Sequence, residues 1–216
     1  MGETKGFATQ FALQLAQCQI QLQGHQTDKL VAYLQLLKKW NARFNLTAIH
    51  ESRWVNELLL DALVALPYIS EGPVLDVGSG AGVPAIPLAI ALPDVHFTLL
   101  DSNGKKTRFI KQVVIDLQIP NVDVVQSRVE DYAAPARFTV ITSRAFTALD
   151  QFVSMTAHLL KEKGEWLAWK GENLRAELDK LSAGIEQVQT IPVSLPETTG
   201  RRYLVRLKKR DHKHQG

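Results

Sequence analysis

The chain has 216 residues, of which 45% are hydrophobic and 22% are charged, with a formal net charge of +3. This composition indicates a folded globular protein and excludes a disordered chain or a fibre. Cys18 is the single cysteine, which excludes an intrachain disulfide. The most apolar stretch, 83–92, contains prolines and is too short to cross a bilayer. Because the N-terminus also lacks a signal-peptide pattern, we expect a cytoplasmic protein without a membrane span.

Charge is unevenly distributed along the chain. Residues 201–216 hold seven Lys or Arg and one Asp, which leaves residues 1–200 with a net charge of −3. A basic end suggests a polyanionic partner, but terminal segments are also basic for solubility alone. Taken by itself, the segment from 210 to 216 favours the second interpretation, a solvated basic tail.

Residues 7–66 have the apolar spacing of helices. Positions Phe7, Phe11, Leu15, Cys18 and Leu22 repeat every three or four residues, and Gly24 ends this first run. Thr27 or Asp28 is expected to cap a second helix, and a third helix is expected over 52–66, before Pro67. We therefore predict a helical extension over 1–70 that packs on the rest of the molecule.

From Pro73 onward, short β-branched runs alternate with helical stretches. Strands are predicted at 74–77, 96–100, 122–125, 138–141 and 166–169, and helices near 84–91, 104–117, 148–160 and 172–182. Strict alternation predicts a parallel sheet with helices on both faces. Two further strands, 188–195 and 203–207, surround a turn, which predicts a terminal antiparallel hairpin. The expected α/β domain, 71–209, is Rossmann-like, with a mostly parallel seven-stranded sheet.

A glycine-rich loop follows the first strand, at the edge where open α/β sheets receive ligands. A dinucleotide site needs G-x-G-x-x-G, but Val83 stands where the third glycine would be. The observed pattern is instead G-x-G-x-G, two residues after an acidic side chain, and it comprises Asp76, Gly78, Gly80 and Gly82. This arrangement is typical of class I methyltransferases that use S-adenosyl-L-methionine (SAM).

Two acidic positions complete the predicted nucleoside site. Asp101 ends the second strand, 23 residues after Gly78, where a carboxylate accepts both ribose hydroxyl protons. The alternative is a glycine-rich turn beside a surface aspartate. After the third strand, Glu130 or Asp131 either faces the adenine amine or caps a following helix, and the sequence leaves both open.

Ser143-Arg144-Ala145-Phe146 closes the fourth strand, where methyltransferases of this kind hold the acceptor against the methyl donor. It is not the Asn/Asp-Pro-Pro-aromatic motif of many enzymes that methylate exocyclic amines of bases. Cys18 lies in the N-terminal helix, so covalent catalysis at carbon-5 of pyrimidines is also disfavoured. We expect a different acceptor atom.

Over nearly its whole length the chain resembles the RsmG (GidB) family. The resemblance is carried by Lys39-Trp40-Asn41, Phe44-Asn45-Leu46-Thr47, 76–84, 97–102, Gly104-Lys105-Lys106, 126–130, Ser143-Arg144-Ala145-Phe146, Lys170-Gly171 and Gly200-Arg201-Arg202. It implies SAM-dependent methylation of guanine N7 at position 527 of 16S ribosomal RNA, in the 530 loop, as free RNA or in the small ribosomal subunit. Matched by position, the family's donor contacts are Gly78, Val83, Val129, Glu130 and Arg144.

The third helix departs from the family pattern. Where the family carries an Arg-His pair and, two residues later, Asp-Ser, this chain has Glu57-Leu58 and Asp61-Ala62. If the Arg-His pair touches RNA in relatives, this chain must bind RNA differently or more weakly.

Guanine N7 has an in-plane lone pair and no proton, so its methylation needs orientation and no general base. Arg144 is the expected orienting residue: its planar fork suits guanine O6, a phosphate or the methionine carboxylate, and the alternative is pairing with a neighbouring carboxylate alone. The turn 196–202 is expected beside this site, so Arg201, Arg202 and Lys170 are the predicted RNA contacts, while 208–210 lie at the opposite edge.

Other features have two interpretations. Trp40 and Phe44 either stack on unpaired bases or pack the extension onto the sheet, and packing is favoured. The lysines near 105–111 are read as a solvated helix face. His212 and His214 lack companion ligands, so no metal is assigned. A monomer is favoured. The competing functions are a SAM-dependent methyltransferase for a small molecule or protein, and a noncatalytic RNA-binding factor.

Overall fold

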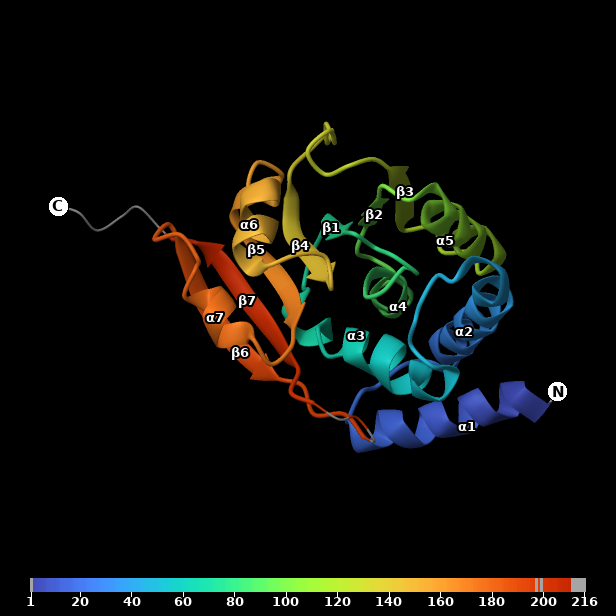
Figure 1. The fold of residues 1–216 in the computed structure, drawn as a ribbon. Coiled ribbons are helices and arrows are strands. Elements are labelled where there is room, and N and C mark those ends of the chain that lie inside the picture. Colours follow the sequence, from blue (N-terminus) through green and yellow to red (C-terminus); the bar gives the residue numbers. More distant parts are fainter. Residues whose placement is uncertain (1, 197, 199, 211–216) are drawn as a thin grey trace.

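A computed structural model describes residues 2–196, 198 and 200–210. Its centre is one seven-stranded sheet in the order β3-β2-β1-β4-β5-β7-β6 (Figure 1). The strands are β1 (Val74–Val77), β2 (Phe97–Asp101), β3 (Val122–Gln126), β4 (Phe138–Arg144), β5 (Leu160–Lys170), β6 (Ile185–Pro192) and β7 (Tyr203–Lys209). The expected fold class is confirmed.

The last strand reverses direction within this sheet. Strands β1 to β5 pair in parallel, whereas β7 is antiparallel to both β5 and β6. Tyr203 therefore lies opposite Lys170 at the carboxyl end of β5, and Lys208 lies opposite Glu165, further back along that strand. The chain thus enters β7 at the carboxyl edge of the sheet and carries 208–210 away from it, as the sequence predicts.

Helices cover the two faces of the sheet unequally. One face receives α1 (Gly2–Gln17), α2 (Gly24–Phe44), a π-helix η2 (Val55–Leu60), α3 (Asp61–Leu63), α4 (Ala85–Ala91) and α5 (Gly104–Asp116), with short 3-10 turns η1 (Glu51–Arg53) and η3 (Leu66–Tyr68). The other face receives α6 (Leu149–Thr156) and α7 (Leu174–Leu178). Neighbouring strand residues such as Leu204 and Val205 point into opposite hydrophobic clusters, because strand side chains alternate between faces.

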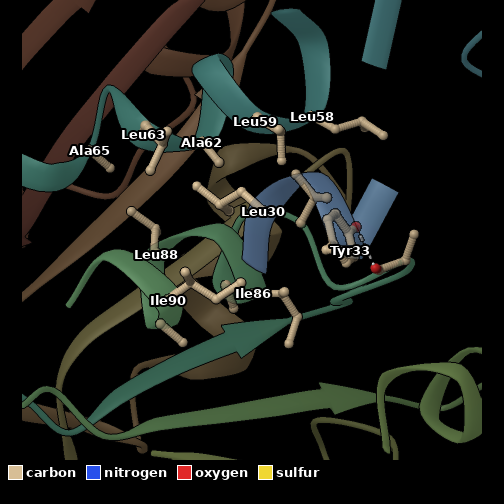
Figure 2. Packing of buried hydrophobic residues seen from close by; sticks show 14 of the residues in the cluster. Leu30, Tyr33, Leu58, Leu59, Ala62, Leu63, Ala65, Ile86, Leu88 and Ile90 are labelled. Atoms are coloured by element: carbon tan, nitrogen blue, oxygen red, sulfur yellow. Dashed lines mark hydrogen bonds between the residues drawn. The ribbon is translucent and has the colours of Figure 1, made fainter. Parts of the chain in front are cut away.

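The N-terminal helices share one hydrophobic cluster with the sheet. Figure 2 shows Leu30 and Tyr33 of α2 against Leu59 of η2 and Ile86 of α4. The Tyr33 hydroxyl also donates a 2.8 Å hydrogen bond to the Ala81 carbonyl in the glycine-rich loop. The extension therefore supports the loop directly, and a boundary near residue 70 stays a prediction.

Several local expectations were wrong. The second helix begins at Gly24 with Gln23 as its N-cap, paired with Gln26 in a capping box, so neither Thr27 nor Asp28 caps it. The segment expected as one third helix consists of the 3-10, π and α turns described above. The helix expected over 148–160 ends at Thr156, because β5 already starts at Leu160.

No helix follows β3, since residues 127–137, all of them described, form turns and loop. Val129 and Tyr132 from this loop pack on the sheet cluster in place of a helix. This excludes the helix-cap interpretation of Glu130 and Asp131. Among the helices of the described residues, none has the length and apolarity needed to span a membrane.

Candidate active site

The glycine-rich loop turns sharply at the end of β1. Gly78, Gly80 and Gly82 have φ values of +71°, +57° and +92°, which side chains other than glycine rarely tolerate. At Gly78 the space is also filled, because a Cβ there would lie 2.6 Å from Cδ2 of Phe146. The ring of Phe146 therefore covers the first turn of the loop.

Asp101 holds the loop from the neighbouring strand. Its buried carboxylate accepts a hydrogen bond from the Gly80 amide at 2.8 Å and another from the Asn103 amide at 2.8 Å. Each carboxylate oxygen has two lone-pair sites, so this anchoring leaves capacity for sugar hydroxyl protons. Asp101 is therefore a buried residue that anchors the loop. This excludes the alternative of a surface aspartate.

Asp76 is a buried acid with an unused oxygen. Oδ1 accepts a 2.8 Å hydrogen bond from the Thr142 hydroxyl, whereas Oδ2 has no partner among the described residues. Burial raises the pKa of Asp76 to about 6, against the opposing effect of the hydrogen bond from Thr142. An unpartnered buried carboxylate oxygen beneath the loop is suited to a cationic or hydrogen-bonding group of a ligand.

A cavity of about 400 Å³ opens at the carboxyl ends of β1, β2 and β3, and we name it the donor pocket. Its lining is Val77, Gly78, Leu100, Asp101, Ser102, Lys106, Ser127, Arg128, Val129, Glu130, Ala145, Phe146 and Met155. Of the residues predicted to contact the cofactor, four are in this lining: Gly78, Asp101, Val129 and Glu130.

The other predicted cofactor residues do not line the donor pocket. They are Asp76, Gly80, Gly82, Val83 and Arg144. Glu130 lines the pocket and Asp131 does not, which favours Glu130 of the two acids left open. Phe146, Lys106 and Met155 were not predicted as pocket residues. Phe146 belonged to a motif already singled out, whereas Met155 lies on α6 and carries no sequence signal.

Arg144 pairs with a carboxylate from the N-terminal extension. Its Nε lies 3.4 Å from Oδ2 of Asp61, whose side chain is 2% exposed. Pairing of Arg144 with a carboxylate, which we did not favour, therefore occurs. The pairing is incomplete, since Nη1 of Arg144 and Oδ1 of Asp61 are buried without hydrogen-bond partners in the described part of the chain. The pKa of Asp61 lies above its usual value because burial, the largest effect, raises it. The nearby charges of Arg144 and Arg202 act in the opposite direction without cancelling that effect.

A second cavity, of about 340 Å³, lies on the other side of Ala145, and we name it the acceptor pocket. It is lined by Asp61, Arg144, Ala145, Trp169, Lys170, Gly171, Glu177 and Arg202. Ala145 lines both pockets and has a φ of +51°, an uncommon value for alanine. The two cavities therefore share a wall residue where the chain leaves β4.

The predicted RNA contacts differ in how far their basic groups are already paired within the protein. Lys170 donates to the Thr147 carbonyl at 2.6 Å and pairs with Glu177 at 2.8 Å, so its ammonium is largely occupied. Arg202 lines the acceptor pocket and pairs with Glu57. Arg201 is exposed and makes no ion pair with the described residues. Of the basic tail, only Arg210 is described; residues 211–216, with His212 and His214, lie outside the described residues.

The departure from the family pattern has a structural explanation. Leu58 is buried in the hydrophobic cluster of Figure 2. Oε2 of Glu57 lies 2.9 Å from Nη2 of Arg202, and Oε1 lies 3.3 Å from Nη1 of Arg53. Glu57 thus partly neutralises Arg202 of the acceptor pocket, and Arg53 beside it.

The aromatic residues of α2 mainly serve packing. The Trp40 ring lies 5.6 Å from that of Phe109 on α5 and 5.3 Å from that of Phe44. Trp40 packs on the core cluster, as expected, whereas Phe44 is 39% exposed.

Comparison with known sequences finds similarity to one protein family over most of the chain. The sequence profile of the family "rRNA small subunit methyltransferase G" (GidB) matches residues 26–205. A curated relative of that name from Chromobacterium violaceum is 47% identical over 195 residues, covering 89% of this chain and 93% of the relative. Another, from Neisseria meningitidis serogroup C, is 49% identical and covers 85% and 89%.

Solved structures of low sequence identity share the fold. N-methyltransferase NodS from Bradyrhizobium japonicum, solved with S-adenosyl-L-homocysteine, superposes with a TM-score of 0.58 at 13% identity, covering 83% of this chain and 99% of NodS. Ribosomal protein L11 methylase from Lactobacillus delbrueckii subsp. bulgaricus gives 0.57 at 13%, covering 69% and 77%. Methyltransferases of this fold take their methyl group from SAM, the cofactor that the sequence predicts. The chain belongs to the rRNA small subunit methyltransferase G family.

Proposed function

We propose that this chain transfers the methyl group of SAM to N7 of a guanine in 16S ribosomal RNA, at position 527 in the 530 loop. The observation that carries the proposal is that Ala145 lines two neighbouring cavities, one at the nucleoside edge of the sheet and one lined by charged groups. The relatives are named as ribosomal RNA small subunit methyltransferases, which supports RNA as the substrate.

The residues around the donor pocket fit the cofactor. Asp101 is suited to the ribose hydroxyls, and Val129 and Glu130 are suited to the adenine. The unpartnered Oδ2 of Asp76 would accept a hydrogen bond from the ammonium group of the methionine part. This would give a buried polar atom the partner that it lacks. Gly78 has no side chain, which lets the Phe146 ring lie directly against the first turn of the loop, at the wall of the donor pocket.

When bound, SAM would supply an activated methyl group: a nucleophile bonds to the methyl carbon as the carbon–sulfur bond breaks, and S-adenosyl-L-homocysteine leaves. Guanine N7 has no proton to lose, so the protein needs to hold the base in line and has no need of a general base. Arg144 is the orienting residue in this proposal, since it precedes Ala145 and lines the acceptor pocket. Its guanidinium presents donors in a fixed plane, which suits a flat base.

RNA contact in this proposal comes from the turn before β7. Arg201 is exposed there, and Arg202 stands at the rim of the acceptor pocket. Lys170, which already holds Thr147 and Glu177, contributes positive potential at the same edge.

The proposal is tested by methyl transfer from radiolabelled SAM to three acceptors: purified small ribosomal subunits, naked 16S RNA and the small molecules of a cell extract. We expect label in RNA, and nuclease digestion with mass analysis should identify it as 7-methylguanosine at one site. Label confined to small molecules would replace the proposal with the alternative, a small-molecule methyltransferase. The comparison of subunits with naked RNA identifies the form of the substrate.

A further inference from the structure

Two residues in the lining of the acceptor pocket each carry an unpartnered polar atom, and the two atoms have opposite character. Nη1 of Arg144 is a hydrogen-bond donor and Oδ1 of Asp61 is an acceptor, and both are buried without partners in the described part of the chain. They belong to neighbouring groups, because Nε of Arg144 and Oδ2 of Asp61 lie 3.4 Å apart. Buried polar atoms without partners destabilise a fold, so this donor and acceptor together indicate a place for a ligand with the complementary pattern.

The chemistry of the pair restricts the ligand. A phosphate or carboxylate on Arg144 would be repelled by the Asp61 carboxylate beside it, so the pair favours a neutral group that offers an acceptor next to a donor. Guanine offers this pattern through O6 and N1–H. Adenine offers the reverse, an amino donor at position 6 next to an acceptor at N1, and would leave both protein atoms facing like groups.

The placement also suits methylation at N7. N7 and O6 lie on the same edge of guanine. Arg144 is followed directly by Ala145, which lines both the acceptor and the donor pockets. A guanine whose O6 is held by Arg144 therefore brings N7 toward the boundary with the donor pocket.

Resting on the proposed function, we propose that Asp61 selects guanine as the acceptor base, its Oδ1 accepting the N1 proton while Nη1 of Arg144 donates to O6. Asp61 is then a specificity-determining residue supplied by the N-terminal extension. The Asp61 side chain is only 2% exposed, so water is excluded from this contact, which strengthens the discrimination between guanine and other bases.

The test combines a change in the base with a change in the protein. RNA fragments containing the target site are prepared with guanine or with 2-aminopurine at the acceptor position, the latter lacking O6 and the N1 proton but keeping N7. Methyl transfer to each is measured as kcat/KM for the wild-type enzyme, for Asp61→Asn and for Glu177→Gln. Glu177 is the matched control, because it is another carboxylate of the same pocket whose Oε2 is already bound by Lys170 and the Leu149 amide.

For the wild-type enzyme we expect a preference for guanine over 2-aminopurine. In Asp61→Asn, kcat/KM for guanine should fall by about tenfold or more, the effect of losing a hydrogen bond to a charged group. The value for 2-aminopurine should stay within about threefold or rise, because the asparagine amide can donate to N1. The ratio between the bases should therefore collapse in this variant and persist in Glu177→Gln. SAM binding by calorimetry should be unchanged in Asp61→Asn.

An equal loss on both bases in Asp61→Asn would overturn the inference and leave Asp61 as a support for Arg144. If that variant does not fold, the wild-type enzyme decides alone: after correction for uncatalysed N7 methylation, it should use inosine, which keeps O6 and N1–H, far better than 2-aminopurine. Equal use of the two would overturn the inference. Failure of wild-type enzyme to methylate any guanine N7 in RNA would instead contradict the proposed function.

Discussion

Glu57 on η2 and Arg202 at the start of β7 form an ion pair with a 2.9 Å separation between Oε2 and Nη2. The pair joins the helical extension to the last strand at the rim of the acceptor pocket. Glu57 is buried, whereas Arg202 is 24% exposed in its side chain. An arginine proposed to meet RNA is thus held and partly neutralised by the protein itself.

Substitution Glu57→Gln should release Arg202 and strengthen RNA binding at low salt. One further phosphate contact steepens the dependence of log affinity on log salt concentration by about 0.7–0.9. The free energy of unfolding should fall by about 2 kcal/mol, because a buried partner of two arginines is lost. RNA titrations at several salt concentrations and thermal unfolding measure both effects.

The control for this variant is Glu165→Gln, which breaks the pair between Glu165 and Arg206 in the middle of β5 and β7. It should leave the salt dependence of RNA binding unchanged. Equal RNA affinity in wild type and Glu57→Gln would show that Arg202 does not contact the phosphate backbone.

Double substitution Arg201→Ala/Arg202→Ala should weaken RNA binding more than removal of the basic tail, residues 210–216. The two arginines enter β7 at the carboxyl edge, next to Lys170, whereas the strand carries the following basic residues away. The salt slope should become shallower by about 0.7 for each lost phosphate contact. If truncation reduces affinity and slope while the double variant does not, the assignment of the RNA surface to this turn is wrong.

Asp76 should give the protein a pH dependence that Asp76→Asn removes. Its pKa is raised from 3.8 to about 6 by burial, so the native state binds the proton more tightly than the unfolded chain. The free energy of unfolding should therefore fall as the pH rises from about 4 to about 6, by about 3 kcal/mol in total, and level off above. Denaturant unfolding of both proteins across this range isolates the difference.

The same carboxyl should link pH to cofactor binding. If Oδ2 of Asp76 receives the ammonium group of SAM, binding favours the ionised form, and affinity should fall as the pH drops below about 6, at most tenfold per pH unit. Calorimetric titration should show this dependence in wild type and its loss in Asp76→Asn. A pH-independent affinity in wild type would remove Asp76 from the binding site.

Substitution Gly78→Ala should impair both folding and SAM binding. The new methyl would meet the Phe146 ring at 2.6 Å, at a φ of +71° that alanine rarely adopts. We expect a loss of about 1–3 kcal/mol in the free energy of unfolding and at least tenfold weaker SAM binding. Gly184→Ala is the matched control, because a Cβ at that position has nothing within 4 Å. Normal SAM affinity in Gly78→Ala would show that the cofactor avoids the first turn of the loop.

Substitution Arg144→Lys keeps the charge and removes the planar fork. Because Arg144 lines the acceptor pocket, kcat should fall by about 100-fold with little change in SAM affinity. A comparable loss of SAM affinity would instead favour contact between Arg144 and the methionine carboxylate, the assignment implied by the family resemblance.

Much of the fold follows from the sequence because strands and helices alternate with clear turn signals from Val74 onward. The glycine pattern and Asp101 identify the nucleoside edge, since both depend on residues close in sequence to strand ends. The hairpin topology likewise predicts that Arg202 and Lys170 meet at one edge.

The rest depends on contacts between distant segments. The pair of Asp61 with Arg144 joins residues 83 positions apart, and no local pattern indicates it. In the sequence alone, Glu57 only replaces a basic residue of the family pattern. The structure shows that it forms an ion pair with Arg202. No local pattern indicates the π-helix either, and after β3 the packing of Val129 and Tyr132 on the sheet takes the place of a helix.

The phenol of Tyr33 reaches the carbonyl of Ala81 across the boundary between the helices and the loop. An evolutionary exchange of the first seventy residues for an unrelated adaptor would therefore strip the cofactor loop of a buried tether, and Asp61 would leave with them. A transplant of the α/β domain alone would therefore have to supply a new hydroxyl for the Ala81 carbonyl and a new carboxylate for Arg144.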